Sequence, residues 1–75
     1  MATTQLDTKG LHCPIPVLKA RRAMKALAAG DILEVEATDP GSVIDFRHFC
    51  NTAGHELLAA DEAAGVFSYR IRKVE

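Results

Sequence analysis

The chain contains no tryptophan, only two cysteines and no long apolar run. Cys13 and Cys50 are too few for the disulfide framework of a small secreted domain, and they lack the CxxC spacing of a zinc site or a thioredoxin-like pair. No segment approaches the ~20 consecutive apolar residues of a membrane span, and residues 2–7 have neither the basic start nor the apolar stretch of a signal peptide. We therefore expect a cytoplasmic protein that works in a reducing compartment and has no membrane partner.

The chain is also short and nearly neutral. Its 75 residues allow one domain, residues 1–75, because a second domain would need a core of its own. The formal net charge of -1 gives no overall attraction to nucleic acid or anionic lipid. A domain of this size has no room for a deep substrate cavity, so any chemistry should lie at the surface. Because the chain has no glycine-rich phosphate loop and no zinc spacing, we expect neither a metal nor an organic cofactor.

Hydrophobic periodicity predicts the element order βαβαββ. The expected elements are a strand at 3–7, a helix at 16–28 capped by Gly30, a strand at 31–37, a helix with Ser42 or Asp39 as its N-cap and Gly54 at its end, and two strands within 55–74. Right-handed crossovers then place both helices on one face of the sheet and leave the other face to solvent. The predicted fold is an α/β (α+β) two-layer sandwich with a four-stranded mixed sheet.

Charge pairing predicts which strands are neighbours. Glu34 and Glu36 face outward on the strand at 31–37, and Arg70 and Arg72 face outward on the last strand. Opposite charges on facing positions stabilise antiparallel pairs. These two strands should therefore lie side by side and antiparallel.

The strongest candidate for chemistry is Cys13, in the stretch GLHCPIP between a strand end and a helix start. Pro14 and Pro16 suit a first helical turn, because the N–H that proline lacks would be unpaired there anyway. Cys13 is thereby placed at or near the N-cap, facing the positive end of the helix dipole. The backbone N–H groups of Ile15 and Val17 are the expected donors to a thiolate or persulfide at this position.

The charges close to Cys13 in the sequence favour the same form of the sulfur. Residues 8–30 contain no acidic residue, and Lys9 lies close by in the chain. The following helix carries four further basic residues: Lys19, Arg21, Arg22 and Lys25. We therefore predict a lowered pKa for Cys13 and a nucleophilic thiolate near neutral pH, rather than a small apolar filler. The basic helix face is either an ordinary solvated surface or a docking surface for acidic patches on partner proteins.

The sequence gives less reason to assign a function to the other candidate residues. Cys50 lies on the apolar stripe of the second helix, so it should be a buried structural thiol, beyond the roughly 7 Å Cα separation that a disulfide with Cys13 allows. His12 either tunes its neighbour Cys13 or points away from it. His48 and His55 have no partner at ligand spacing, and we predict no function for them.

The chain resembles the TusA/SirA-like sulfur-carrier family over nearly its whole length. The resemblance rests on GLHCPIP, which contains a C-P-x-P motif, followed by VLKARRAMKAL, ILEVEATDP with GS opening the second helix, and the GHELL segment. It implies a βαβαββ sandwich with strand order 1-2-4-3. It also implies a protein-to-protein sulfurtransferase whose motif cysteine, Cys13, accepts sulfane sulfur as a persulfide and passes it to another protein.

The resemblance implies partners as well. Donors in the family are cysteine desulfurases or rhodanese-like proteins, and recipients serve tRNA thiolation, molybdenum-cofactor pathways or sulfur oxidation. Two rival classes are weaker. A thiol redox regulator needs a second thiol within reach of Cys13. A nucleic-acid-binding module needs a positive net charge and more free aromatic side chains than this chain has.

Overall fold

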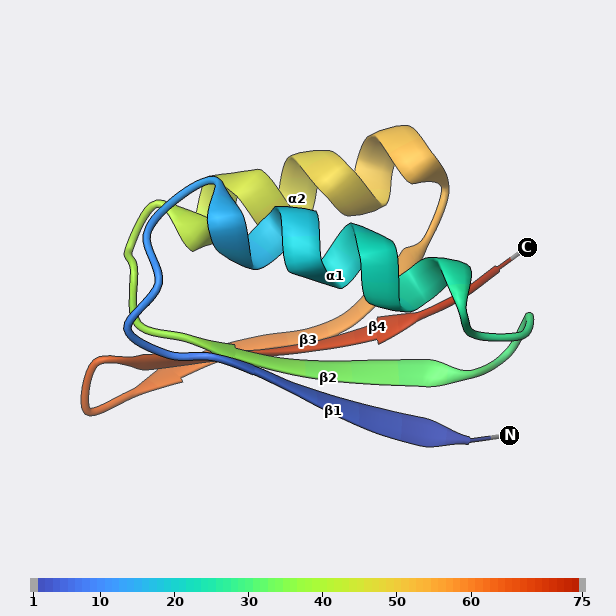
Figure 1. The fold of residues 1–75 in the computed structure, drawn as a ribbon, viewed down its shortest axis with the longest axis horizontal. Coiled ribbons are helices and arrows are strands. Elements are labelled where there is room, and N and C mark those ends of the chain that lie inside the picture. Colours follow the sequence, from blue (N-terminus) through green and yellow to red (C-terminus); the bar gives the residue numbers. More distant parts are fainter. Residues whose placement is uncertain (1, 75) are drawn as a thin grey trace.

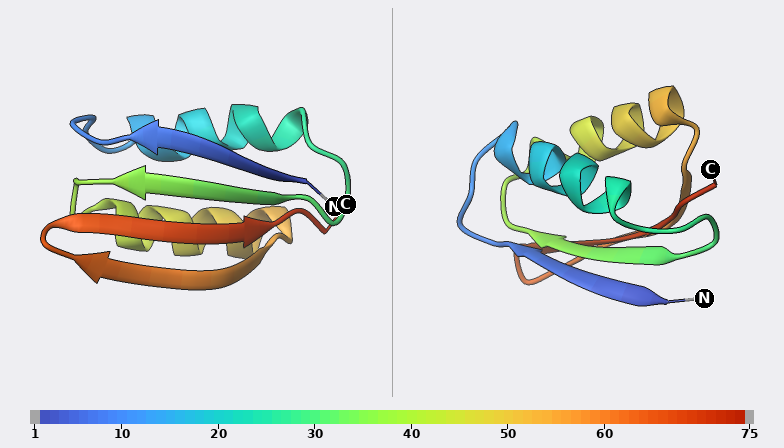
Figure 2. Two further views of the ribbon diagram at one scale, coloured as in Figure 1. Left: turned by 90° about the horizontal axis from the view of Figure 1, so that it is seen from below. Right: turned by 45° about the vertical axis from the view of Figure 1, so that its right-hand side comes forward.

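A four-stranded sheet with two helices on one of its faces makes up the computed structural model, which describes residues 2–74 (Figure 1; Figure 2). The elements are β1 (Thr3–Thr8), α1 (Ile15–Lys25), β2 (Ile32–Ala37), α2 (Ser42–Ala53), β3 (Glu56–Ala63) and β4 (Val66–Arg72). The strand order is β1-β2-β4-β3; β1 is parallel to β2, and the other pairs are antiparallel. The predicted fold is confirmed. Neither helix within 2–74 is long and apolar enough to cross a membrane.

The core fills the space between the helices and one face of the sheet. Its side chains follow the two expected periods, every three to four residues on the helices and every second residue on the strands. The helices contribute Val17, Ala20, Met24, Phe46, Phe49 and Cys50, and the strands contribute Leu33, Val35, Ala37, Tyr69 and Ile71. The ring of Phe46 stacks on that of Tyr69 with centroids 4.5 Å apart, which joins α2 to β4.

The end of α1 differs from the prediction. The helix ends three residues early, and its last N–H groups bond three residues back instead of four, as from Ala26 to Ala23 at 3.1 Å. Gly30 does adopt a left-handed φ of 92°, but it lies beyond the C-cap, which is Ala26. The Asp31 carboxylate accepts the Ala28 N–H at 3.0 Å, so a turn closed by this aspartate replaces the expected last helical residues.

The start of α2 also differs. Its N-cap is Gly41, and no side chain caps the helix, so the prediction of Ser42 or Asp39 as N-cap was wrong. The Ser42 hydroxyl instead forms a buried hydrogen bond with the Tyr69 hydroxyl at 2.7 Å. The Asp39 carboxylate accepts the Gly41 N–H and also a donor from the loop that precedes α1.

Two turns depend on left-handed backbone. Gly54 ends α2 with φ 78°, as predicted. Ala64 and Gly65, both with positive φ, join β3 to β4. Positive φ at both residues is the requirement of a two-residue type I′ hairpin turn.

The charge match between β2 and β4 is half confirmed. Glu34 lies opposite Arg70 and pairs with it at 3.0 Å. Arg72 pairs across the other side of β4, with Glu56 of β3. Glu36 lies opposite Ser68 and finds its partner on the β1 side.

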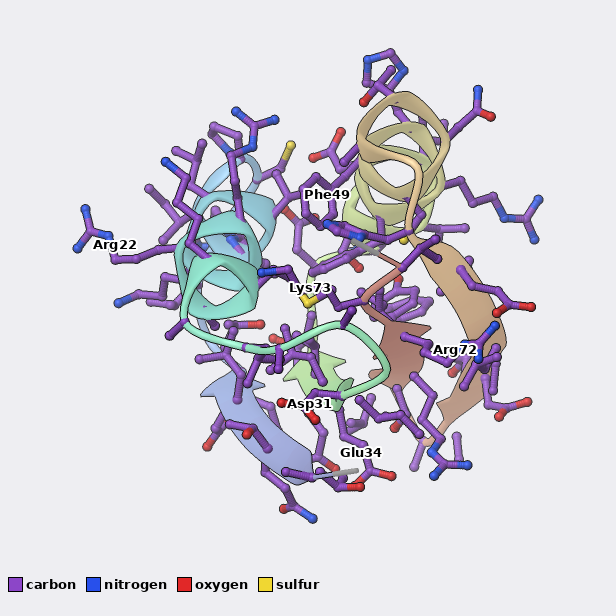
Figure 3. The ribbon with its side chains drawn as sticks, turned by 90° about the vertical axis from the view of Figure 1, so that its right-hand side faces the viewer. Arg22, Asp31, Glu34, Phe49, Arg72 and Lys73 are labelled. Atoms are coloured by element: carbon purple, nitrogen blue, oxygen red, sulfur yellow. The ribbon has the colours of Figure 1, made fainter. Side chains whose placement is uncertain are left out.

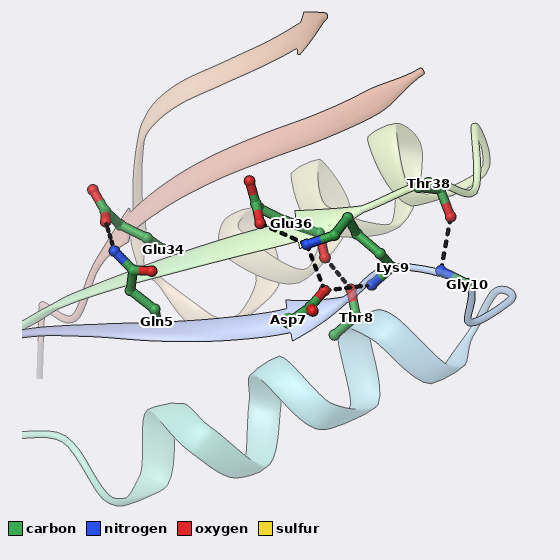
Figure 4. A network of polar contacts seen from close by, with 8 residues as sticks. All are labelled: Gln5, Asp7, Thr8, Lys9, Gly10, Glu34, Glu36 and Thr38. Carbon is green, nitrogen blue, oxygen red and sulfur yellow. Dashed lines mark hydrogen bonds and ion pairs between the residues drawn. The ribbon is translucent and has the colours of Figure 1, made fainter. Parts of the chain in front are cut away.

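That partner is Lys9, part of a polar network on the open face of the sheet (Figure 4). Its ammonium group binds Glu36 at 2.8 Å and Asp7 at 3.0 Å. The next residue, Gly10, donates its N–H to the Thr38 hydroxyl at 2.9 Å, which ties the loop after β1 to the end of β2. Lys9 is therefore held by carboxylates of the sheet and contributes nothing to the expected positive surroundings of Cys13.

Candidate functional site

Both helices begin at the same end of the molecule, where the parallel strands β1 and β2 end (Figure 1). The loops at 9–14 and 38–41 therefore meet there. In open α/β sheets this edge commonly collects functional groups. Cys13 is exposed in the first loop, directly before Pro14, the N-cap of α1, and the Cys13–Pro14 peptide bond is cis.

Two carboxylates, one from the loop at 38–41 and one from the first turn of α2, form hydrogen bonds with Cys13. Asp39 accepts its backbone N–H, and Asp45, in the first turn of α2, accepts a hydrogen bond from its Sγ. Gly41 lies beside the cysteine, since a Cβ added to this glycine would be 3.6 Å from the Cys13 Cβ. The thiol thus lies against the start of α2 as well as the start of α1.

These carboxylates reverse the prediction for the Cys13 thiol. The hydrogen bond to Asp45 raises the pKa of Cys13, and partial desolvation and the negative charges of Asp45 and Asp39 act in the same direction. The prediction of a lowered pKa was wrong. It counted only acids near Cys13 in the sequence, whereas the two carboxylates come from positions 26 and 32 residues further along the chain.

The two backbone donors predicted for the sulfur are placed differently. The N–H of Ile15 donates to the His12 carbonyl at 2.8 Å, so it is already engaged within the loop. The N–H of Val17 donates to none of the acceptors in residues 2–74. Pro14 and Pro16 lie at the helix start, as predicted, but the helix begins at Ile15, with Pro14 as its N-cap and Cys13 one residue before it.

An apolar surface at the same end of the molecule as Cys13 was not predicted from the sequence. Ile15 and Leu18 of α1 are 41% and 48% exposed, and Ile44 of α2 is 75% exposed. All three lie in the first turns of the two helices, off the stripes that enter the core. In the sequence, the signal for this surface was that these apolar residues lie off the buried stripe of each helix. We call Ile15, Leu18 and Ile44 the apolar collar.

The four basic residues of α1 are all exposed, and none forms an ion pair within residues 2–74. Arg21 leans toward α2, with its guanidinium carbon 5.6 Å from the centroid of the Phe49 ring. Arg22 points away from the rest of the molecule (Figure 3). Arg21 and Lys25 also line a groove of about 400 Å³ at the opposite end of the helices from Cys13, whereas Lys19 and Arg22 do not.

The remaining candidates lie apart from the thiol chemistry. Cys50 is a free thiol with 4% of its surface exposed, and burial raises its pKa to about 11. His12 and His48 are exposed, whereas His55 is half-buried with its ring edge against Phe49. No three His, Cys, Asp or Glu side chains within the described part of the chain converge as metal ligands.

Comparisons with known proteins agree on one family. The family model described as "Sulfurtransferase TusA" matches residues 4–73. The chain is 45% identical over 69 residues to the sulfur carrier protein TusA of Allochromatium vinosum, which covers 92% of this chain and 91% of that protein. It is 52% identical over 68 residues to a TusA of Pseudomonas putida, covering 91% and 85% of the two chains.

A solved structure extends the likeness to the whole fold. The crystal structure of the SirA-like protein from Desulfitobacterium hafniense matches with a TM-score of 0.81 and 28% identity over all of both chains. The sandwich, the C-P-x-P loop at the start of α1 and these similarities agree. The chain therefore belongs to the TusA sulfurtransferase family.

Proposed function

We propose that the protein is a sulfur carrier that accepts sulfane sulfur on Cys13 as a persulfide and delivers it to an acceptor protein. The observation that carries this proposal is the contrast between its two thiols: Cys13 is exposed at the meeting point of two helix starts, whereas Cys50 is buried in the core. The relatives named as sulfur carriers support the same role.

The transfer is a simple exchange at sulfur. Cys13 Sγ attacks the outer sulfur of a donor persulfide, a new S–S bond forms, and the S–S bond of the donor breaks. The donor leaves as a thiol that has taken the Cys13 proton, and delivery to an acceptor thiol repeats the same exchange. Because no net oxidation or reduction occurs, the step needs no cofactor. A convex, exposed site gives the second protein access to the sulfur.

Mass spectrometry after incubation with a cysteine desulfurase and cysteine tests the assignment. Cys13→Ser should abolish an adduct of about 32 Da, the mass of one sulfur atom, because the nucleophile is gone. Cys50→Ala is the matched control and should still acquire it, since Cys50 is buried. Equal labelling of the two variants would contradict the assignment to Cys13.

For partners we propose a cysteine desulfurase or rhodanese-like donor and a downstream acceptor protein. Both would cover the apolar collar, since exposed apolar side chains at the end of the molecule that carries the reactive atom are typical of interaction sites. The basic side chains Lys19, Arg21, Arg22 and Lys25 would face acidic patches of these proteins. We further propose that the chain acts as one domain in the cytoplasm, where free thiols stay reduced.

The docking proposal is best tested at Arg22, because this side chain points into solvent (Figure 3). Arg22→Gln should slow sulfur uptake from the desulfurase several-fold and flatten the salt dependence of the rate, since charge steering is screened over ~8 Å at physiological ionic strength. Arg70→Gln removes the same charge from the open face of the sheet and should leave both unchanged. If the rate of sulfur uptake depends on salt identically in wild type and Arg22→Gln, the basic face is an ordinary solvated surface and not a docking surface.

A further inference from the structure

We propose that Asp45 holds Cys13 as a hydrogen-bonded neutral thiol in the unloaded carrier and makes it select partners that bring a positive charge beside their reactive sulfur. The proposal rests on the proposed role of Cys13 as the sulfur-accepting residue. It specifies the sign of the charge that the partner carries beside its reactive sulfur. The basic face of α1 does not specify that sign.

The geometry places the carboxylate on the reacting atom itself. Asp45 accepts the hydrogen bond from Cys13 Sγ, and its own N–H donates to the Gly41 carbonyl at 3.3 Å. The first turn of α2 therefore fixes where the carboxylate stands. Asp39 binds the backbone N–H of the same cysteine, so the whole residue is anchored to the α2 side of the site.

No ion pair within the described residues neutralises this negative charge. The ion pairs in residues 2–74 involve carboxylates of the sheet strands, and none involves Asp39 or Asp45. His12, on the same loop as the cysteine, is the titratable neighbour that acts on Asp39. Arg47 of α2 acts on the Tyr69 hydroxyl and forms no ion pair with either carboxylate in this part of the chain.

An unpaired carboxylate beside a thiol disfavours the thiolate, and the pKa of Cys13 is raised accordingly. It also repels the negative charge of an approaching persulfide. A cation on the partner changes both effects at once, because it pairs with Asp45, frees the thiol from its hydrogen bond and stabilises the thiolate. Transfer then proceeds as Cys13–SH plus R–S–S⁻ to Cys13–S–S⁻ plus R–SH, with the Cys13 proton ending on the leaving sulfur. In the absence of such a partner the thiol stays protected.

Two small disulfides of opposite charge test the proposal without any partner protein. Cystamine carries two ammonium groups and 3,3′-dithiodipropionate two carboxylates, and each forms a mixed disulfide with Cys13 while releasing half of itself as a thiol. Wild type should prefer cystamine. In Asp45→Asn the ratio of the two rates should fall several-fold, because cystamine loses an attraction to the carboxylate and 3,3′-dithiodipropionate loses a repulsion from it. Asp61→Asn removes an exposed carboxylate of β3 and should keep the wild-type ratio.

A neutral reagent separates this role from a structural one. With iodoacetamide, the midpoint of the alkylation rate against pH should shift down in Asp45→Asn and stay near the wild-type value in Asp45→Glu. In wild type alone, 1 M salt should lower the cystamine preference to the ratio that the two leaving thiols set, because the Debye length shrinks to about 3 Å. This last measurement needs no variant, so it tests the charge preference even where a substitution impairs folding.

An unchanged rate ratio in Asp45→Asn, or a preference that 1 M salt does not lower, would overturn the proposal. So would an alkylation midpoint that does not move. The readouts concern the thiol of Cys13 and not its cargo. If these disulfide and alkylation experiments fail, the proposed sulfur-carrier function is not affected. If the 32 Da adduct is missing, the measured charge preference of the Cys13 thiol is not affected.

Discussion

Asp39 links the two loops that build the site, because one carboxylate accepts the N–H groups of both Cys13 and Gly41. These two bonds lower the pKa of Asp39, and His12 adds a smaller effect in the same direction. A carboxyl whose pKa is lowered in the folded state contributes stability above its ordinary pKa of ~3.9, and that contribution is lost as pH falls through the lowered value. The link between the loops is thus intact at neutral pH and weakens only in acid.

At this scale the sequence predicts what is local. Pro14 and Pro16 place Cys13 before a helix start, because proline geometry acts on adjacent residues. The hydrogen-bond partners of Cys13 cannot be predicted from neighbouring residues. Asp39 and Asp45 follow β2 in the chain and come close to Cys13 only because β2 lies parallel to β1. Asp39 has the residue type of an N-cap, yet it lies two residues before Gly41, the actual N-cap, and binds a cysteine N–H that no local rule brings to it.

Among the elements, α1 is connected to β4 through Lys73. The ammonium group donates to the carbonyls of Met24 and Leu27 at 2.8 and 2.6 Å, and Lys73 lies between the helix ends and the strand (Figure 3). The last carbonyls of a helix lack intrahelical partners and carry its negative dipole end. The element order followed from periodicity, but the end of α1 depends on Lys73 and Asp31, which the periodicity of the helix does not contain.

Lys73→Met should destabilise the protein by about 1–2 kcal/mol, because it keeps the aliphatic stem but removes the ammonium donor from both carbonyls, and the Met24 carbonyl then keeps only the Leu27 N–H. Lys25→Met is the matched control; this exposed side chain forms no hydrogen bond within residues 2–74, so its effect should be close to zero. Urea unfolding followed by circular dichroism measures both. Equal midpoints for the two variants would show that the Lys73 bonds contribute nothing net.

The molecule as a whole separates its charges although its net charge is only -1. The solvent side of α1 is positive, the open face of the sheet consists largely of paired charges, and the end that carries Cys13 is negative. Together the two proposals predict a partner with charges of both signs, acidic groups toward α1 and a cation beside its reactive sulfur. Opposite requirements on adjacent surfaces discriminate against wrong partners more strongly than a single charged patch.

The core of the whole molecule contains one titratable thiol, and it should set the alkaline limit of stability. Burial raises the pKa of Cys50 to about 11, against ~8.5 for an exposed thiol in the unfolded chain. A group whose pKa is raised by folding stabilises fully below the unfolded value and loses that contribution as pH rises through the folded value. The free energy of unfolding should therefore fall between pH ~8.5 and about 11, by up to ~1.4 kcal/mol per pH unit.

Cys50→Ala isolates this effect, because the raised pKa values of Tyr69 and Cys13 act equally in both proteins. At pH 7 the variant should be the less stable, since a buried side chain has lost its sulfur. As pH rises toward 11 under a reducing agent, wild type loses the Cys50 contribution and the variant does not, so their urea midpoints should converge. A difference between the midpoints that stays constant from pH 7 to 11 would show that Cys50 does not titrate while the core is folded.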